Sequence, residues 1–363
     1  MTDKYIVASA DFGATNSRLF LREQNYAGVI LPDTVFTAST KTTRFIGPKG
    51  YLCENIDAAL EELLSQIYKG LKPEERKMVR VFSVSSHGSS NFICLDDSGQ
   101  PIFGTPSYDH PLTEKDDGLF YDKFGSPDEL YLETGTPVQP KALSWAKLLF
   151  HHMKKHKDAW NQVRYIVPLS GYIAFKLCRS FDSLASEHTH MHNHGYGRNT
   201  EKGFSSVIRR MGIEELFPPA KKAYEAAGFI DARIAEKYGF SKNAVVTVGG
   251  HDSSIFAMMP QLLGIGDAIT VSTGTWDIVM ARRDVFLEPR LQSRWLLYNA
   301  TVENEPLRTV NLRAGDMRDM YLRQCKMPND VSFDENVMSE VLAGDDIIMP
   351  AYMDGFGPYP HSN

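Results

Sequence analysis

The sequence predicts an α/β fold, because strand patterns and amphipathic helix patterns alternate along its 363 residues. Strands are expected at 5–10, 18–22, 79–84, 163–167 and 244–248, and helices at 56–69, 142–156, 172–177 and 232–238. A strand, a turn of small residues and a second strand also occur twice, around Gly13 and around Gly274, at an offset of 261 residues. We therefore expect two similar domains, 1–245 and 246–363.

Local signals support the individual elements. The segment Ile56–Lys69 carries apolar residues at helical spacing, with Asn55 as its N-cap and Gly70 at its end. Asp231 is the matching N-cap of the helix at 232–238. The Gly-containing turn between the first two strands predicts a β-hairpin.

Composition excludes several classes of protein. A hydrophobic fraction of 42% with 23% charged residues is that of a globular chain rather than a disordered one. Lys and Arg total 39 against 45 Asp and Glu, and this net charge of −6 gives no general attraction for nucleic acid or for an anionic membrane. No apolar run approaches the roughly 20 residues of a membrane helix, and the mean hydropathy is −0.29. The four cysteines are scattered without zinc-binding spacing, so we expect reduced thiols in a soluble, cytoplasmic protein.

The two small-residue turns are candidate phosphate sites. Gly lets backbone N–H groups approach a polyphosphate closely, and Ser and Thr hydroxyls donate to its oxygens. The first turn follows Asp11, whose carboxylate at a strand end suits a hydrated Mg²⁺ beside phosphates. A hairpin turn also contains Gly for backbone reasons alone, which leaves a purely structural role open for each turn.

A further candidate is the segment Gly249-Gly250-His251-Asp252, where a strand runs through paired glycines into a helical pattern. Asp252 would lie at the helix start, where the helix dipole keeps its carboxylate ionised. The alternative is that Asp252 is only the N-cap, since Asp is a preferred capping residue in any protein.

In their order and spacing, these motifs resemble the FGGY family of carbohydrate kinases, within the superfamily of actin-like ATPases. The segments that carry the resemblance are 11–18, 85–88, 95–99, 134–135, 182–186, 249–252 and 272–275. The resemblance spans nearly the whole chain. It implies two ribonuclease H-like domains, a sugar-binding one and a nucleotide-binding one, and ATP-dependent phosphorylation of a sugar or polyol hydroxyl in the cleft between them.

The resemblance also implies roles for single residues. It makes Asp252 the general base and Asp11 the carboxylate that organises Mg²⁺. The positions that match the family's phosphate-contacting residues are Gly13, Thr15, Arg18, Gly274 and Thr275. The positions that match its substrate-facing residues are His87, Gly88, Tyr108 and Asp109, together with Asp252. The second turn and the Gly-His-Asp context look more like kinases of deoxyketohexoses such as fuculose and rhamnulose than like glycerol kinase.

Members of the family usually continue with a Gly-rich turn and a helix that hold adenine and ribose. The resemblance therefore implies an incomplete second domain, and weak ATP binding with little or no kinase activity by this chain. The expected partners include a homodimer or a complementing polypeptide. A non-catalytic or split sugar-binding relative is the alternative. An actin-like or chaperone-like ATPase is disfavoured, because the segments around His87 and Asp252 suit a small hydroxyl acceptor.

Four histidines occupy alternate positions from His188 to His194. In a strand they would share one face and could bind zinc. No carboxylate or thiol has a suitable spacing around them, and the resemblance places a variable strand and turn here. We do not expect a metal site in this segment.

Overall fold

The computed structural model describes residues 4–25, 30–88, 92–139, 141–192, 195–199, 203–266, 268–274, 276–282, 289–293, 295–312, 314–324, 326, 336, 339, 340 and 343. Within these ranges, strands and helices alternate as the sequence predicts.

A mixed sheet forms the centre of the first part of the chain, with the strand order β13-β14-β6-β1-β2-β3. Its members are β1 (Lys4–Phe12), β2 (Asn16–Asn25), β3 (Ile30–Lys41), β6 (Val79–Ser86), β13 (Ala226–Phe229), β14 (Val245–Thr247) and β15 (Gly250–His251), which pairs with β6. Strand β2 runs antiparallel to both of its neighbours, β1 and β3, whereas β6 runs parallel to β1, and β14 and β15 run parallel to β6. The carboxyl ends of β1, β6 and β15 therefore meet at one edge.

Helices cover this sheet and bury its apolar side chains. The covering helices are α1 (Ile56–Gly70), α2 (Pro73–Met78), α7 (Leu169–Cys178) and α10 (Ala232–Tyr238). The side chain of Asn55 accepts a hydrogen bond from Ala58 N, and the side chain of Asp231 caps α10, so both predicted caps are confirmed. One continuous core joins the buried faces of α1, α7 and α10 to the strands.

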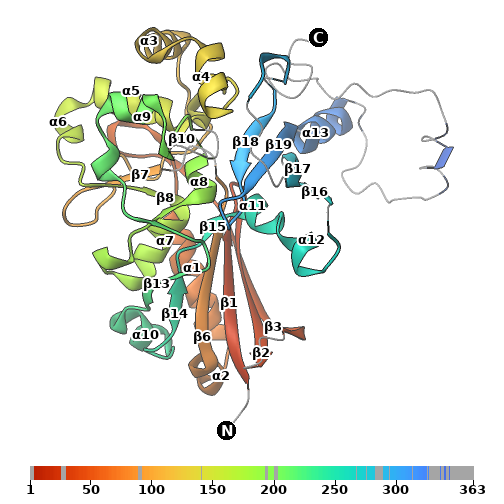
Figure 1. Ribbon diagram of the computed structural model, residues 1–363. Helices are drawn as coiled ribbons and strands as arrows, with labels where there is room; N and C mark the ends of the chain where they lie inside the picture. Colours follow the sequence, from red (N-terminus) through yellow and green to blue (C-terminus); the bar gives the residue numbers. More distant parts are fainter. Residues whose placement is uncertain are drawn as a thin grey trace.

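A second core lies beyond the carboxyl ends of the strands, where Figure 1 shows a group of helices above the sheet. Its elements are α3 (Glu114–Phe124), α4 (Pro127–Thr134), α5 (Trp145–Lys155), α6 (Lys157–Trp160), α9 (Ser206–Met211), β7 (Phe92–Leu95) and β8 (Tyr165–Pro168). Trp145 stacks on Phe92 with ring centroids 4.2 Å apart at its centre. The helix expected at 142–156 begins only at Trp145, because the Ser144 side chain caps it by accepting from Lys147 N.

Several further elements lie outside this sheet and this group of helices. They are β4 (Arg44–Ile46), β5 (Leu52–Glu54), β9 (Ser186–Glu187), β10 (Arg198–Asn199), β11 (Gly203–Phe204), β12 (Ala220–Lys221), α8 (His188–His192), α11 (Asp252–Phe256), α12 (Met259–Leu262) and α13 (Ala314–Gln324). The histidine-rich segment is thus a helix over His188–His192, so its described histidines do not share the face of a strand. None of the helices in the described ranges has the length and apolar composition needed to cross a bilayer.

A second, antiparallel sheet follows, with the order β16-β17-β19-β18. Its strands are β16 (Ile269–Ser272), β17 (Asp277–Arg282), β18 (Leu297–Ala300) and β19 (Pro306–Leu312). The repeated hairpin is confirmed, since β17 begins at Asp277, 261 positions after Asn16 opens β2. The domain boundary at 245/246 stays a prediction.

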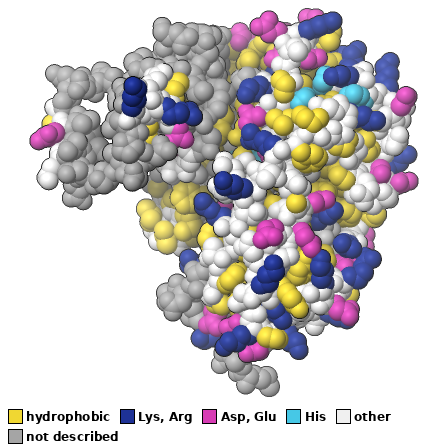
Figure 2. All heavy atoms as spheres, turned by 180° about the vertical axis from the view of Figure 1, so that it is seen from behind, with side chains coloured by type: hydrophobic (Ala, Val, Ile, Leu, Met, Phe, Trp, Pro, Cys, Tyr) yellow, Lys and Arg dark blue, Asp and Glu magenta, His cyan; other side chains and the backbone are white. Residues whose placement is uncertain are grey.

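The two parts of the chain meet where β18 packs near the end of α4. Tyr298 N donates to Gly135 O at 3.0 Å, and the Tyr131 hydroxyl donates to Leu296 O at 3.1 Å. Figure 2 shows the molecule from behind, with basic and acidic side chains interspersed on the face that is drawn. Exposed apolar side chains occur around α12 and β16, where Leu262 is 75% and Ile269 70% exposed.

Candidate active site

Three neighbouring strand ends bring the predicted site residues together. Asp11, near the end of β1, lies opposite Ser85 of β6, and Gly250 of β15 lies opposite the same residue from the other side. His87 directly follows β6, and Asp252 directly follows β15. Ligands of open α/β sheets bind at such carboxyl edges, so this edge is the candidate site.

Asp11 is a partly buried carboxylate with a neighbour of like charge. The Ser85 hydroxyl donates to Asp11 Oδ1 at 2.9 Å, and Arg18 faces Asp11 across the β1–β2 pair. Burial raises the pKa of Asp11, and the negative charge of Asp252 raises it further, while Ser85, His87 and Arg18 act in the opposite direction. A cation bound between the two carboxylates and the phosphates would relieve this repulsion.

Asp11 fits an Mg²⁺ that is held largely by other ligands. Within the described ranges, no group of three or more His, Cys, Asp or Glu side chains could hold a metal ion by itself. Mg²⁺ is commonly held by one or two carboxylates, waters and the phosphates of a nucleotide. The residues present therefore suit an ion that arrives with phosphates.

Asp252 opens helix α11 as its first residue. The N-cap is His251, whose side chain makes no capping hydrogen bond, so the reading of Asp252 as the N-cap is wrong. Asp252 Oδ1 accepts from Ser253 N at 2.5 Å and from Ser253 Oγ at 3.1 Å, and it lies 3.2 Å from His251 Nε2. Oδ2 has no hydrogen-bond partner in the described part of the chain, and the side chain is 35% exposed. The carboxylate is thus anchored at one oxygen and open at the other.

The paired glycines allow the turn that aims Asp252. Gly249 has φ of +76°, and a Cβ at this position would lie 2.5 Å from Val84 O. A Cβ at Gly250 would lie 3.2 Å from Thr189 Oγ1. Only a residue without a side chain fits Gly249 without strain, which explains this part of the motif.

The substrate side of the edge contains a buried ion pair. His87 Nε2 lies 2.8 Å from Glu54 Oε2, and the Ser107 hydroxyl donates to Glu54 Oε1 at 3.0 Å. Burial disfavours the charged form of His87, but the Glu54 carboxylate together with Asp252 and Asp11 outweighs burial, so the pKa of His87 is raised. Gly88, the next residue, is also buried. The segment after β6 is therefore held firmly at the site.

Tyr108 and Asp109 separate in the structure. The Tyr108 ring packs edge-on against His87, with ring centroids 5.8 Å apart, whereas Asp109 forms ion pairs with Arg44 at 2.9 Å and Lys141 at 3.2 Å. Tyr108 therefore adjoins the site, while the Asp109 carboxylate is held by two cations.

The two hairpin turns carry the predicted phosphate-contacting residues. In the first turn, Gly13 N donates to Asn16 O at 3.0 Å, and Thr15 and Arg18 are exposed. Gly274 of the second turn is exposed as well, and Thr275 lies outside the described residues.

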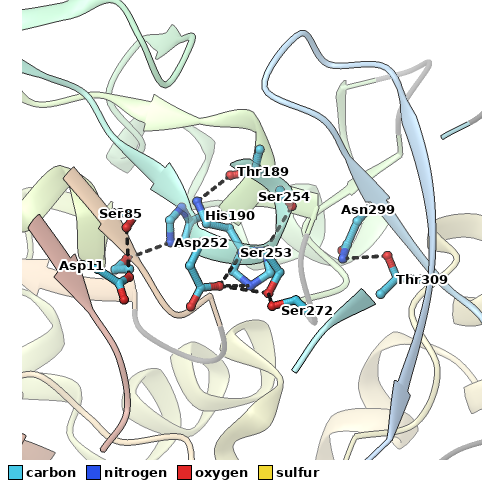
Figure 3. A network of polar contacts seen from close by, with 12 residues as sticks. Asp11, Ser85, Thr189, His190, Asp252, Ser253, Ser254, Ser272, Asn299 and Thr309 are labelled. Carbon is cyan, nitrogen blue, oxygen red and sulfur yellow. Dashed lines mark hydrogen bonds and ion pairs between the residues drawn. The ribbon is translucent and has the colours of Figure 1, made fainter. Parts of the chain in front are cut away.

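Contacts from the second hairpin reach the site. Ser272 Oγ lies 3.5 Å from Ser253 Oγ, and Trp276 hydrogen-bonds to Tyr108. Figure 3 shows the Asp252 carboxylate between Asp11 and Ser272. Both hairpins thus contribute to one site.

Sequence reasoning missed several supporting residues. Glu54, Ser85, Thr189 and Trp276 contact the predicted residues but were not predicted to do so. Ser85 stands inside the motif segment 85–88 and Trp276 directly follows the segment 272–275, whereas Glu54 and Thr189 carry no local signal that could have found them.

Comparisons with known proteins agree with this geometry. Residues 266–363 match the C-terminal domain of the FGGY carbohydrate kinases. The putative sugar kinase YoaC of Bacillus subtilis is 26% identical over 209 residues, which are 55% of this chain and 39% of that protein. The L-fuculokinase of Haemophilus influenzae is 30% identical over 146 residues, 39% of this chain and 29% of that protein. The resemblance to the FGGY carbohydrate kinases is confirmed.

Solved structures extend the likeness of fold to the whole chain. A carbohydrate kinase from Novosphingobium aromaticivorans superposes with a TM-score of 0.82 at 22% identity, covering 99% of this chain and 74% of that chain. The ligand-bound xylulose kinase from Lactobacillus acidophilus gives a TM-score of 0.68 at 15% identity, covering 88% and 62%. The actin-like fold of the FGGY kinases is therefore confirmed. The matched region spans only 39% and 29% of the two curated relatives.

Proposed function

We propose that this protein transfers the γ-phosphate of ATP to a hydroxyl group of a sugar, such as a ketose, or of a polyol. The observation that carries the proposal is the pairing of Asp252, open at Oδ2, with Asp11 at one carboxyl edge of the sheet. The sugar kinases among its relatives support the reaction class.

Asp252 acts as the general base. As the substrate oxygen forms its bond to the γ-phosphorus, the bond from that phosphorus to the β–γ bridging oxygen breaks, and ADP leaves with the electron pair. The proton of the attacking hydroxyl passes to Asp252. The substrate hydroxyl becomes acidic only as its oxygen bonds to phosphorus, so a carboxylate is a sufficient proton acceptor.

The remaining predicted residues position the reactants. Asp11 would hold Mg²⁺, which supplies charge neutralisation at the phosphates when bound. The phosphate side would comprise Gly13, Thr15, Arg18, Gly274 and Thr275, because described strands of both hairpins reach the edge where Asp252 lies.

The sugar would lie against His87, Gly88 and Tyr108, on the side of the buried Glu54 pair. Asp109 would act on the sugar chiefly by holding the Tyr108 loop, given its ion pairs with Arg44 and Lys141. Buried polar groups of this kind reject sugars that leave them unpaired. The likeness to L-fuculokinase makes a deoxyketohexose the first substrate to test.

The proposed cellular setting is the cytoplasm, with a small sugar or polyol as the partner. A homodimer or a complementing polypeptide stays a prediction, for which the exposed apolar side chains around α12 and β16 offer a surface.

The test combines binding and turnover on the same chain. Ketoses, deoxyketoses and polyols are titrated by calorimetry, and ADP release is measured with each at several-millimolar Mg-ATP. We expect one sugar to bind and to stimulate ADP release. Asp252→Asn should bind that sugar as wild type does but lose about 10²–10⁴-fold or more in turnover, because it keeps the size of the side chain and removes the proton acceptor.

Asp158→Asn on α6 is the matched control, since this exposed carboxylate lies on a helix of the second core. It should leave binding and turnover unchanged. Turnover of Asp252→Asn within a few-fold of wild type would show that Asp252 is not the base. Sugar binding without phosphoryl transfer would instead favour a non-catalytic sugar-binding protein.

A further inference from the structure

His251 lies between the candidate base and a serine. Its Nε2 is 3.2 Å from Asp252 Oδ1, and its Nδ1 is 3.0 Å from Ser254 Oγ. The ring is 5% exposed. Burial lowers the pKa of His251 to about 4, so the ring is neutral at pH 7 and carries a single proton.

The two neighbours decide which nitrogen holds that proton. An ionised carboxylate only accepts hydrogen bonds, whereas a serine hydroxyl can donate or accept. The favourable arrangement therefore has the Ser254 hydroxyl donating to Nδ1 and the Nε2–H donating to Asp252 Oδ1. The opposite tautomer would set the lone pair of Nε2 against the carboxylate.

This arrangement distinguishes the two oxygens of Asp252. Oδ1 receives donors from Ser253 N, Ser253 Oγ and His251, whereas Oδ2 has none in the described part of the chain. We propose that His251 is a positioning residue that holds Oδ1 of Asp252, so that Oδ2 receives the proton of the substrate hydroxyl. The proposal rests on the kinase function above and adds the atom that accepts the proton and the residue that presents it.

The histidine-rich segment has a role in this arrangement. His251 N donates to Thr189 Oγ1 at 2.9 Å, and the Thr189 hydroxyl in turn donates to Glu187 Oε2. The same Glu187 oxygen accepts from Thr189 N at 2.9 Å and from His190 N at 3.2 Å. Glu187, Thr189 and His190 are all fully buried. The start of α8 therefore anchors the backbone of His251 from behind the site.

His251 itself is excluded as the base. A neutral ring whose Nδ1 accepts from Ser254 and whose Nε2 carries a proton has no lone pair directed at a substrate. Its contribution is to orient Asp252, and this separates it from a His that takes the proton directly.

Kinetics with paired variants tests the positioning role. His251→Leu removes the donor to Oδ1, whereas His251→Gln can supply a neutral N–H at a similar reach. We expect His251→Leu to lower kcat about 10–100-fold, the effect of losing one hydrogen bond to a charged group, with the KM for sugar unchanged. His251→Gln should recover most of that loss.

A second pair tests the anchor from α8. Thr189→Val removes the hydroxyl at nearly constant volume, and Thr189→Ser keeps it. Thr189→Val should lower kcat and Thr189→Ser should not. Thermal unfolding of all four variants identifies any that fail to fold, and Asp252→Asn serves as the reference for loss of the base.

The tautomer of His251 is measured directly by ¹⁵N–¹H correlation spectra of histidine-labelled protein at pH 7, without any turnover. We expect the Nε2–H form in the wild type and also in Ser254→Ala, because the Asp252 carboxylate still accepts from Nε2. An Nδ1–H form or an imidazolium in the wild type would overturn the proposal. So would wild-type kcat in a folded His251→Leu while Asp252→Asn is inactive. Full turnover by Asp252→Asn would instead contradict the proposed role of Asp252 as the base, and it would not affect the measured tautomer of His251.

Discussion

Acidification should destabilise the fold through His251, and the size of the effect follows from its burial. The pKa of this ring is lowered from 6.5 to about 4 because the ring is buried. Below pH 6.5 the unfolded chain therefore binds a proton at His251, whereas the folded protein binds this proton only below about pH 4. The free energy of unfolding is unaffected by His251 at pH 7.5 and falls by about 1.4 kcal/mol per pH unit between these two values. At pH 5 the accumulated loss is about 2 kcal/mol.

The comparison with His251→Gln isolates this contribution, because glutamine does not titrate. Urea unfolding at pH 7.5, 6 and 5, followed by the fluorescence of the four tryptophans, gives the free energy of unfolding of both proteins. Other groups with shifted pKa values, such as Asp11, contribute equally to both and cancel. The wild type should lose about 2 kcal/mol more than the variant between pH 7.5 and 5. A difference that stays constant over this range would refute the account of a neutral, buried His251.

Three further outcomes are expected from the site. Gly249→Ala should lower the free energy of unfolding by at least about 2 kcal/mol, because the φ of +76° is strained for alanine and its Cβ would lie 2.5 Å from Val84 O. Urea unfolding measures this change. A loss below about 0.5 kcal/mol would contradict the turn geometry. Asp11→Asn should raise the free energy of unfolding at neutral pH, because burial and Asp252 disfavour the charge on Asp11. The same variant should abolish sugar-dependent ADP release. A variant that is less stable and fully active would show that Asp11 serves stability rather than the reaction. Removing Mg²⁺ with EDTA should stop ADP release while calorimetric sugar binding persists, and loss of both would place the ion in the sugar site.

Local signals predicted the elements that local interactions determine. The helices at 56–70 and 232–238 have side-chain caps and a regular apolar face, and the structure confirms them to within a residue. The repeated hairpin was also visible, because a turn between antiparallel strands needs small residues wherever it occurs.

Helix α8 and strand β3 were not predicted. Alternate histidines fit the period of a strand, but the segment forms α8, because the buried Glu187 carboxylate accepts from the amides of Thr189 and His190 and so satisfies the first turn of a helix. Strand β3 at 30–41 was not predicted, and it is placed by pairing with β2.

The residues of the candidate site differ in how far the sequence could predict them. The placement of Asp11, His87 and Asp252 at the ends of strands could be predicted, because each stands in a recognisable motif near the end of a strand pattern. Their supports could not, since Glu54 reaches His87 across 33 positions and Thr189 reaches His251 across 62. Such contacts arise only once the strand order is known.

The charges at the carboxyl edge argue for function rather than stability. Asp11 and Asp252 repel each other in a partly buried setting, and a fold selected for stability alone would keep only one of them. Arg18 and His87 offset the repulsion without removing it, since the pKa of Asp11 remains raised. Two carboxylates with different surroundings, one held by a serine near a turn and one anchored at a single oxygen, suit two different tasks. In the phosphoryl transfer proposed above, one carboxylate would serve the cation and the other the proton, and Mg²⁺ arriving with its phosphates would relieve the repulsion between them.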